Sequence, residues 1–99
     1  MTTYANPGSD GAVVSFQDRY GHYIGGEWVD PAKGQWFENP SPVNGEVFTE
    51  IARGTADDVE KALDAAHAAA PAWGRTSPAE RANILNKIAD RMEQNLEVL

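Results

Sequence analysis

Few side chains in this sequence belong to the types that usually perform catalysis or bind metal ions. The 99 residues contain no cysteine and only two histidines, His22 and His67. Without cysteine these residues can form neither a thiolate nucleophile nor a cysteine-based metal site, and two histidines are too few for a metal cluster by themselves. His67 lies in the run AAHAAA, and we expect it to be an exposed or half-buried helix residue and not a ligand.

Two pairs of carboxylates have the chemistry of general acids and bases. Asp57 and Asp58 open a helical pattern, where negative charge is stabilised by the positive end of the helix dipole. Glu46 and Glu50 lie in a segment with strand-like alternation, where a place on the strand surface explains them. We therefore predict structural roles for both pairs and assign no catalytic residue.

Binding motifs for nucleotides and nucleic acids are equally weak. The pair Gly25-Gly26 lacks the G-x-G-x-x-G spacing and does not open a helix, so it is not a phosphate-binding loop. The formal net charge of −7 opposes binding to phosphate backbones or to an anionic membrane. The tryptophans have no basic residues interleaved with them and are predicted to be core or interface anchors: Trp28, Trp36 and Trp73.

The clearest structural element is a helix that begins after Ser77. Ser77 can accept a hydrogen bond from the N–H of Glu80, Glu80 can reach back in a capping box, and Pro78 suits the first helical position. Apolar residues then recur at helical spacing: Ile84, Leu85, Ile88, Ala89, Met92 and Leu96. No glycine, proline or cationic last turn follows Leu96. We therefore expect this helix, and the chain, to continue past Leu99.

A second helix is predicted to begin at Thr55, because Thr55 and Asp58 have the spacing of a capping box. Its apolar face is mostly alanine, which suits close approach to another element better than a deep core. Pro71 and Gly74 are predicted to end it, which makes residues 71–75 a connector between the two helices.

Short extended runs separated by turns precede the helices. The run YIGGEWV, residues 23–29, is predicted to be one strand interrupted by two glycines. The turn-forming residues 30–34 then predict a hairpin that pairs this run with QWFENP, residues 35–40. A second turn at residues 42–45, which includes the Asn44-Gly45 pair, leads into a third strand over residues 47–51.

The first 19 residues are rich in glycine, serine, asparagine and proline and are predicted to form a flexible arm. They contain neither a basic region nor an apolar run of signal-peptide length, so we expect a cytoplasmic protein. Taken alone, short strands followed by two helices with one apolar face each define an α+β segment with a small hydrophobic core. A small acidic binding or scaffolding protein without catalytic activity is one interpretation of such a segment.

The order of the elements also resembles a known family. The stretch YIGGEWV, the pairs Asn39-Pro40 and Asn44-Gly45, the helix start ADDV at residues 56–59, and SPAER at residues 77–81 follow one another as in the N-terminal section of NAD(P)-dependent aldehyde dehydrogenases. The portion from residue 64 onward is most similar to the bacterial branch that acts on acetaldehyde and other short aliphatic aldehydes. This resemblance implies an α/β fold in which residues 20–99 are the first part of the nucleotide-binding domain, truncated at Leu99.

The resemblance also implies what a longer enzyme would do. Members of the family use a catalytic cysteine and a glutamate to oxidise an aldehyde to the carboxylic acid, with NAD or NADP as hydride acceptor. None of those residues lies in the matching part of the pattern, so the 99 residues alone are expected to be inactive and to bind no cofactor. The remainder of the chain and a homodimer or homotetramer are the implied partners. Some members hold a structural sodium ion through backbone carbonyls that correspond here to Phe37 and Glu38.

Overall fold

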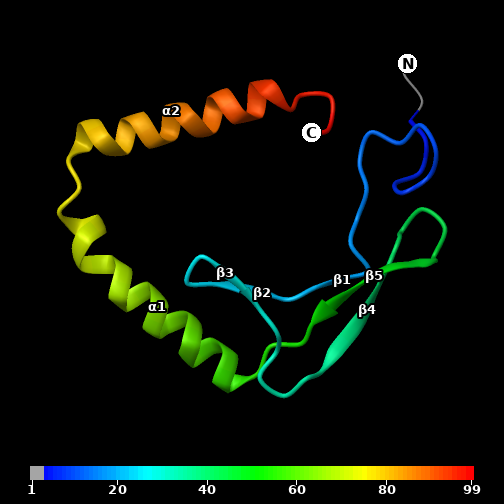
Figure 1. The fold of residues 1–99 in the computed structure, drawn as a ribbon, viewed down its shortest axis with the longest axis horizontal. Coiled ribbons are helices and arrows are strands. Elements are labelled where there is room, and N and C mark those ends of the chain that lie inside the picture. The colour runs from blue at the N-terminus through cyan, green and yellow to red at the C-terminus, as the bar shows by residue number, and fades with distance from the viewer. Residues whose placement is uncertain (1–3) are drawn as a thin grey trace. The chain divides into compact units, whose positions relative to one another are not determined.

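The computed structural model describes residues 4–99, which form five short strands followed by two helices (Figure 1). The strands are β1 (Arg19–Tyr20), β2 (His22–Ile24), β3 (Glu27–Val29), β4 (Trp36–Pro40) and β5 (Val47–Ala52), and the helices are α1 (Ala56–Gly74) and α2 (Pro78–Gln94). Contacts group the described chain into two units, residues 16–70 and residues 4–15 with 71–99. Within residues 4–99, neither helix combines the length and the apolar character that crossing a membrane requires.

A three-stranded sheet with the order β1-β5-β4 forms the first unit's main layer. β4 and β5 are antiparallel, and the connection between them closes through hydrogen bonds from Ser41 N–H to Glu46 O (2.8 Å) and from Gly45 N–H to Ser41 O (2.8 Å). The predicted turn at residues 42–45 and the third strand after it are therefore confirmed. β1 runs parallel to β5, and the buried Thr49 hydroxyl donates to the carbonyls just before β1. This parallel pairing has no local signal in the sequence.

The run at residues 23–29 is a hairpin and not one interrupted strand, so that prediction was wrong. Gly25 and Gly26 have φ of 62° and 83°, and two successive positive φ values form the tight turn that joins β2 to β3. Glycine adopts this conformation without a steric penalty, which is why the chain reverses here. Because β2 pairs with β3, the predicted pairing of residues 23–29 with residues 35–40 does not form. β4 pairs with β5 instead. The residue 30–34 turn does form, with Gly34 N–H bonded to Pro31 O at 2.9 Å, but it connects two different sheets.

Helix α1 starts where the capping pattern predicted but ends later. Thr55 precedes the first helical residue, and its N–H and hydroxyl both donate to the Asp58 carboxylate. The prediction that Pro71 helps to end the helix was wrong, because the helix continues through Pro71 to Gly74. A proline this close to the end removes only one backbone hydrogen bond, and the N–H of Arg75 still bonds to Pro71 O at 3.3 Å. The connector between the helices is therefore shorter than predicted.

Helix α2 has the predicted N-terminus. Ser77 is the N-cap, with extended backbone angles, and its hydroxyl accepts from Glu80 N–H at 3.2 Å. Arg81 adds a contact to the preceding helix, since it donates to Trp73 O at 2.7 Å and its guanidinium lies 5.1 Å from the Trp73 ring.

The C-terminal end of α2 differs from the prediction. The helix ends at Gln94 and does not continue, because the Asn95 amide donates back to Arg91 O at 2.7 Å and the Asn95 carbonyl accepts from Val98 and Leu99 at 3.1 Å. Arg91 also supplies a cation in the last turn, which the sequence interpretation had missed. A side-chain amide at the C-cap satisfies a carbonyl that the helix leaves free, so a stop is possible without glycine or proline.

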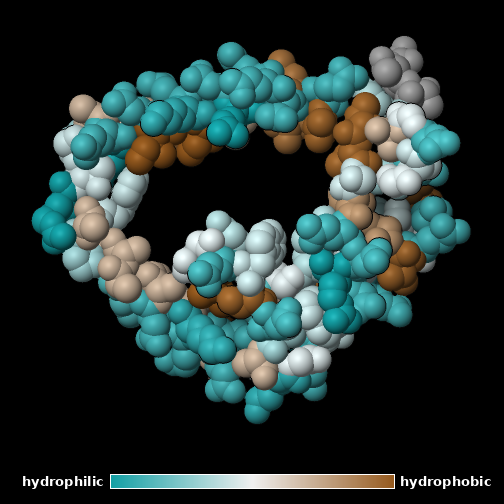
Figure 2. Space-filling model, viewed as in Figure 1, coloured by the Kyte–Doolittle hydropathy of each residue, from teal (hydrophilic) through white to brown (hydrophobic). Residues whose placement is uncertain are grey.

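Burial is concentrated in the first unit. Four residues of the described chain are buried: Thr49 and Ala52 in β5, Asp58 in the first turn of α1, and Pro31 in the turn before β4. No residue of α2 is buried, and Figure 2 shows apolar side chains gathered along one side of this helix. The predicted flexible arm lies partly outside the description, since residues 1–3 are not described. Residues 6–12 contain two turns closed by backbone hydrogen bonds of 3.1 Å, and the flexibility of the arm stays a prediction.

Candidate functional site

The most constrained polar group in the described chain is the carboxylate of Asp58, which is 4% exposed. One oxygen accepts from the N–H of Ala32 at 2.9 Å, and the other accepts from the N–H and the hydroxyl of Thr55 at 2.9 and 3.1 Å. Asp58 therefore joins the start of α1 to the turn that precedes β4. We call Asp58, Thr55, Ala32 and the neighbouring His22 the Asp58 cluster.

His22 completes this cluster from β2. Its Nε2 atom lies 3.6 Å from an oxygen of Asp58 and, within residues 4–99, has no hydrogen-bond partner although it is buried. A side chain on Gly54 would place its first carbon 3.6 Å from the imidazole ring, so the ring packs directly beside this glycine. Three segments that are distant in the sequence, β2, the residue 30–34 turn and the start of α1, thus meet at one carboxylate.

Hydrogen bonding makes Asp58 a stronger acid than usual. The backbone N–H of Ala32 contributes most to lowering the pKa of Asp58 below its ordinary value, followed by the N–H of Thr55, the Thr55 hydroxyl and the charge of His22. Burial acts in the opposite direction but does not prevail. Asp58 is therefore ionised at neutral pH. Because a general acid or base works best when its pKa is close to neutrality, Asp58 is poorly suited to either role.

The geometry of the cluster fits a structural role, in which Asp58 holds three segments of the chain together. Both carboxylate oxygens already accept hydrogen bonds, and the lowered pKa of Asp58 makes it too weak a base to activate the Thr55 hydroxyl that donates to it. Asp58 was predicted to stabilise the helix start, which the structure confirms. Its contacts to Ala32 and His22 were missed, because no local spacing in the sequence reports a contact across 26 residues.

The other carboxylate pair and the second histidine also take structural positions. Glu50 forms an ion pair with Arg19 at 3.0 Å across β1 and β5, on the exposed part of the sheet. His67 is exposed on α1, as predicted. Among residues 4–99, no three carboxylate or imidazole side chains come together as a metal site would require.

Two of the three tryptophans, Trp28 and Trp73, are more exposed than core anchors would be. Trp28 is 64% exposed and lies 5.1 Å from the ring of Tyr23 and 6.1 Å from that of Tyr20. Trp73 is 50% exposed. A core role for these two residues is therefore wrong within the described chain, and an interface role stays a prediction.

Phe37 and Glu38, the predicted sodium ligands, are successive residues of β4. They face Ile51 and Glu50 in the antiparallel ladder. In such a ladder the carbonyls of neighbouring residues point to opposite sides of the strand, so one points toward β5 and the other away from it. Sodium binding by these carbonyls stays a prediction.

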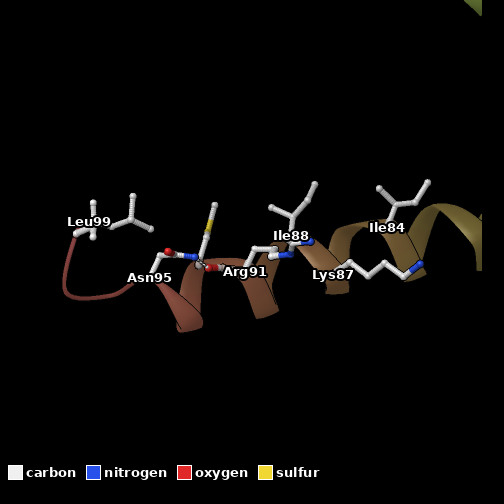
Figure 3. A pocket seen from close by; sticks show the side chains of 8 residues that line it. Ile84, Lys87, Ile88, Arg91, Asn95 and Leu99 are labelled. Atoms are coloured by element: carbon white, nitrogen blue, oxygen red, sulfur yellow. Dashed lines mark hydrogen bonds between the residues drawn. The ribbon is translucent and has the colours of Figure 1, made fainter. Parts of the chain in front are cut away.

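A hollow lies along one face of α2. It is an open groove of about 640 Å³ whose apolar side chains come from the helix and from the turn after it: Ile84, Ile88, Met92, Val98 and Leu99. Lys87 and Arg91 flank these side chains. Figure 3 shows Ile84 and Ile88 pointing to the same side of the helix. An apolar stripe of this length flanked by cations is the form of a helix face that packs against other protein.

The fold and these sites together define a structural α/β segment whose polar cluster holds elements in place. Comparison with known proteins identifies its family. The sequence profile described as the aldehyde dehydrogenase family matches residues 28–99, and the chain belongs to this family.

Individual relatives match over the whole chain. A probable aldehyde dehydrogenase of Streptomyces coelicolor is 75% identical over 99 residues, which are 100% of this chain and 20% of that protein. An acetaldehyde dehydrogenase of Pseudomonas aeruginosa is 69% identical over 96 residues, which are 97% of this chain and 19% of that protein. The crystal structure of PnpE in complex with nicotinamide adenine dinucleotide superposes with a TM-score of 0.76 at 39% identity, over 85% of this chain and 17% of that one.

The chain thus spans about one fifth of the length of the curated relatives that it matches. The alternative interpretation, a small binding or scaffolding protein without catalytic activity, finds no support in these comparisons. The resemblance to aldehyde dehydrogenases and the α/β assignment are confirmed.

Proposed function

We propose that this chain is the N-terminal scaffold of a longer NAD(P)-dependent aldehyde dehydrogenase that oxidises a short aliphatic aldehyde to the carboxylic acid. The observation that carries the proposal is the match over the full chain at 75% identity to a relative of which the chain covers 20%. The exposed apolar face of α2 supports it, since an apolar stripe of this kind is normally covered in a folded enzyme.

The described residues do not fit the dinucleotide. A helix N-terminus binds phosphate through free N–H groups, but the start of α1 already holds the Asp58 carboxylate, whose charge repels phosphate. At the start of α2 the N–H of Glu80 already donates to the Ser77 hydroxyl. Gly25-Gly26 forms a hairpin turn and not a phosphate-binding loop. Residues outside this chain are therefore proposed to bind NAD or NADP, and the relative of known structure with bound NAD makes NAD the first cofactor to test.

In the proposed enzyme the role of this chain is positional. The Asp58 cluster fixes the direction in which α1 leaves the sheet, and α2 presents its apolar face to the rest of the protein. Residues 20–99 are proposed to be the first part of the nucleotide-binding domain. The arm over residues 1–19 is proposed to be flexible up to its last residue, Arg19, which lies in β1. A cytoplasmic homodimer or homotetramer, acetaldehyde as substrate and a sodium ion at the carbonyls of Phe37 and Glu38 complete the proposal. The substrate is suggested by the acetaldehyde dehydrogenase of P. aeruginosa.

The test uses the full-length protein with acetaldehyde and NAD. We expect aldehyde-dependent formation of NADH by the full-length protein, whereas the 99-residue chain shows no activity and no nucleotide binding in titration calorimetry. Propionaldehyde, and NADP in place of NAD, test the choice of substrate and cofactor. A full-length protein that forms no NADH with either aldehyde and either nucleotide would contradict the proposed activity, and micromolar binding by the short chain would contradict its role as scaffold.

A further inference from the structure

One asparagine differs from the others in the residue on its C-terminal side. The sequence has six asparagines, and Asn44 is the one that precedes a glycine. Asn6 and Asn39 precede prolines, which have no N–H, and the next residues are bulkier at the remaining three: Asn83, Asn86 and Asn95. A glycine leaves its own backbone nitrogen unshielded by a side chain.

The Asn44-Gly45 pair lies in the exposed connection between β4 and β5. The Asn44 side-chain oxygen accepts from the N–H of Glu46 at 3.0 Å, and the Asn44 amide nitrogen lies 3.5 Å from the Glu46 carboxylate. The N–H of Gly45 donates to Ser41 O at 2.8 Å, and Gly45 has a φ of 74°. The turn thus holds the side-chain carbonyl of Asn44 against the N–H of Glu46, one residue beyond the Gly45 nitrogen.

We propose that Asn44 is the principal site of spontaneous deamidation in this chain. The Gly45 nitrogen loses its proton to hydroxide and attacks Cγ of Asn44, forming a new C–N bond. The bond from Cγ to Nδ2 then breaks, and the nitrogen takes a proton from water and leaves as ammonia. One water molecule opens the resulting succinimide at either carbonyl, which gives aspartate or isoaspartate. The sequence of steps consumes water, releases ammonia and involves no change of oxidation state.

The turn acts on this reaction in two opposing ways. The Glu46 N–H points at the oxygen on which negative charge develops during attack, so it stabilises that charge. The bond from Gly45 N–H to Ser41 O, however, holds the proton that must leave. Because the attacking nitrogen has to give up this hydrogen bond before it reacts, we expect the folded turn to deamidate more slowly than the unfolded chain.

The products would disturb the same turn. Either product loses the amide that faces Glu46 and places a second carboxylate beside it. Isoaspartate also lengthens the backbone by one carbon within the connection that sets the pairing of Pro40 with Val47. We therefore expect the end of the β4–β5 ladder to open more readily after deamidation.

Peptide mapping of the full-length protein tests the proposal. After incubation in mildly alkaline buffer, we expect deamidation at Asn44 to be about tenfold faster than at Asn83, Asn86 or Asn95, a barrier difference of about 1.4 kcal/mol. Both aspartate and isoaspartate should form, and urea should raise the rate. Asn44→Gln should remove the modification, whereas the matched control Asn83→Gln should leave it unchanged.

Three results would overturn the proposal. They are a rate at Asn44 no greater than at the other asparagines, aspartate formed without isoaspartate, and a rate in urea below that of the folded protein. The second result would indicate direct hydrolysis of the amide, and the third would show that the bond to Ser41 does not restrain Gly45.

Discussion

The first turns of α1 and α2 are specified in the same local way but are integrated into the structure very differently. Both helices begin after a hydroxyl residue that shares a hydrogen bond with the third residue of the helix, Thr55 with Asp58 and Ser77 with Glu80. In α1 that third residue is 4% exposed and also contacts a distant turn, whereas no residue of α2 is buried. A capping pattern therefore determines where a helix begins, and only burial shows what the helix packs against.

The difference has an energetic consequence. A helix of this length is only marginally stable in water on its own, and packing of its apolar face supplies most of its stability in a protein. Ile88 is 47% exposed and Leu85 is 66% exposed, so α2 gains little from contacts within the described residues. If the chain is the scaffold of a longer enzyme, the stabilising contacts of α2 come from the remainder of that enzyme.

The largest expected effect is at Ile88. In the full-length protein, Ile88→Asp would place a charge on the apolar groove of α2, at a cost of several kcal/mol if that groove is covered. We expect loss of soluble, assembled protein and, with it, loss of aldehyde-dependent NADH formation. Gel filtration and the NADH assay measure both outcomes.

The matched control for Ile88 is Asn83→Asp, which adds the same charge at an exposed position of the same helix outside the groove. We expect this control variant to be assembled and active. An Ile88→Asp protein that is as soluble and active as the control would show that the groove of α2 faces solvent in the full-length protein.

A smaller effect is expected at Asp58. Asp58→Asn replaces one accepting oxygen with an amide that donates, so either orientation of the amide sets two donors against each other at Ala32 or at Thr55. We expect a lower midpoint of thermal unfolding in the full-length protein. Asp57→Asn removes a charge from the same helix turn at an exposed position, and we expect a clearly smaller decrease from it. Equal decreases for the two variants would show that only the helix dipole matters here.

The Asp58 cluster also predicts a dependence on acid. Because the folded state lowers the pKa of Asp58, its contribution to stability is complete above the ordinary pKa of 3.8 and is lost as the pH falls from there through the lower pKa of the folded state. The difference in stability between the native protein and Asp58→Asn should thus be constant near neutral pH and shrink below about pH 3.8. Urea unfolding at several pH values measures this, and a difference that begins to shrink near neutrality would contradict the lowered pKa.

Local chemistry explains which features the sequence was able to predict. Ser77, Thr55 and the turn before Val47 act on residues within three or four positions, and each was predicted correctly. The failures have two physical causes. Gly25-Gly26 can either interrupt a strand or reverse it, and the choice depends on whether the flanking residues find partners in each other.

The second cause is distance along the chain. The parallel pairing of β1 with β5 joins Arg19 to Glu50, and the Asp58 cluster joins residues 22, 32 and 58. No spacing rule connects such residues, so the contacts by which Asp58 joins distant segments were not predictable. Its capping role was predictable because Thr55 lies only three positions away. Family membership was recognisable for the opposite reason, since many short local patterns occurred together in a specific order.

The smallest expected effect is at Ser77. Ser77→Ala removes the acceptor for the N–H of Glu80, and loss of an N-cap of this type costs about 1 kcal/mol. Because Pro78 and the rest of α2 are unchanged, we expect the cost to appear as faster amide hydrogen exchange in the first turn of α2, with little change near Asp58. Ser77→Asp provides the control, since aspartate also accepts at an N-cap and should keep exchange slow. If Ser77→Ala exchanges as slowly as the native protein, the hydroxyl of Ser77 does not determine where α2 begins, and the similarity between the two helix starts does not extend to their energetics.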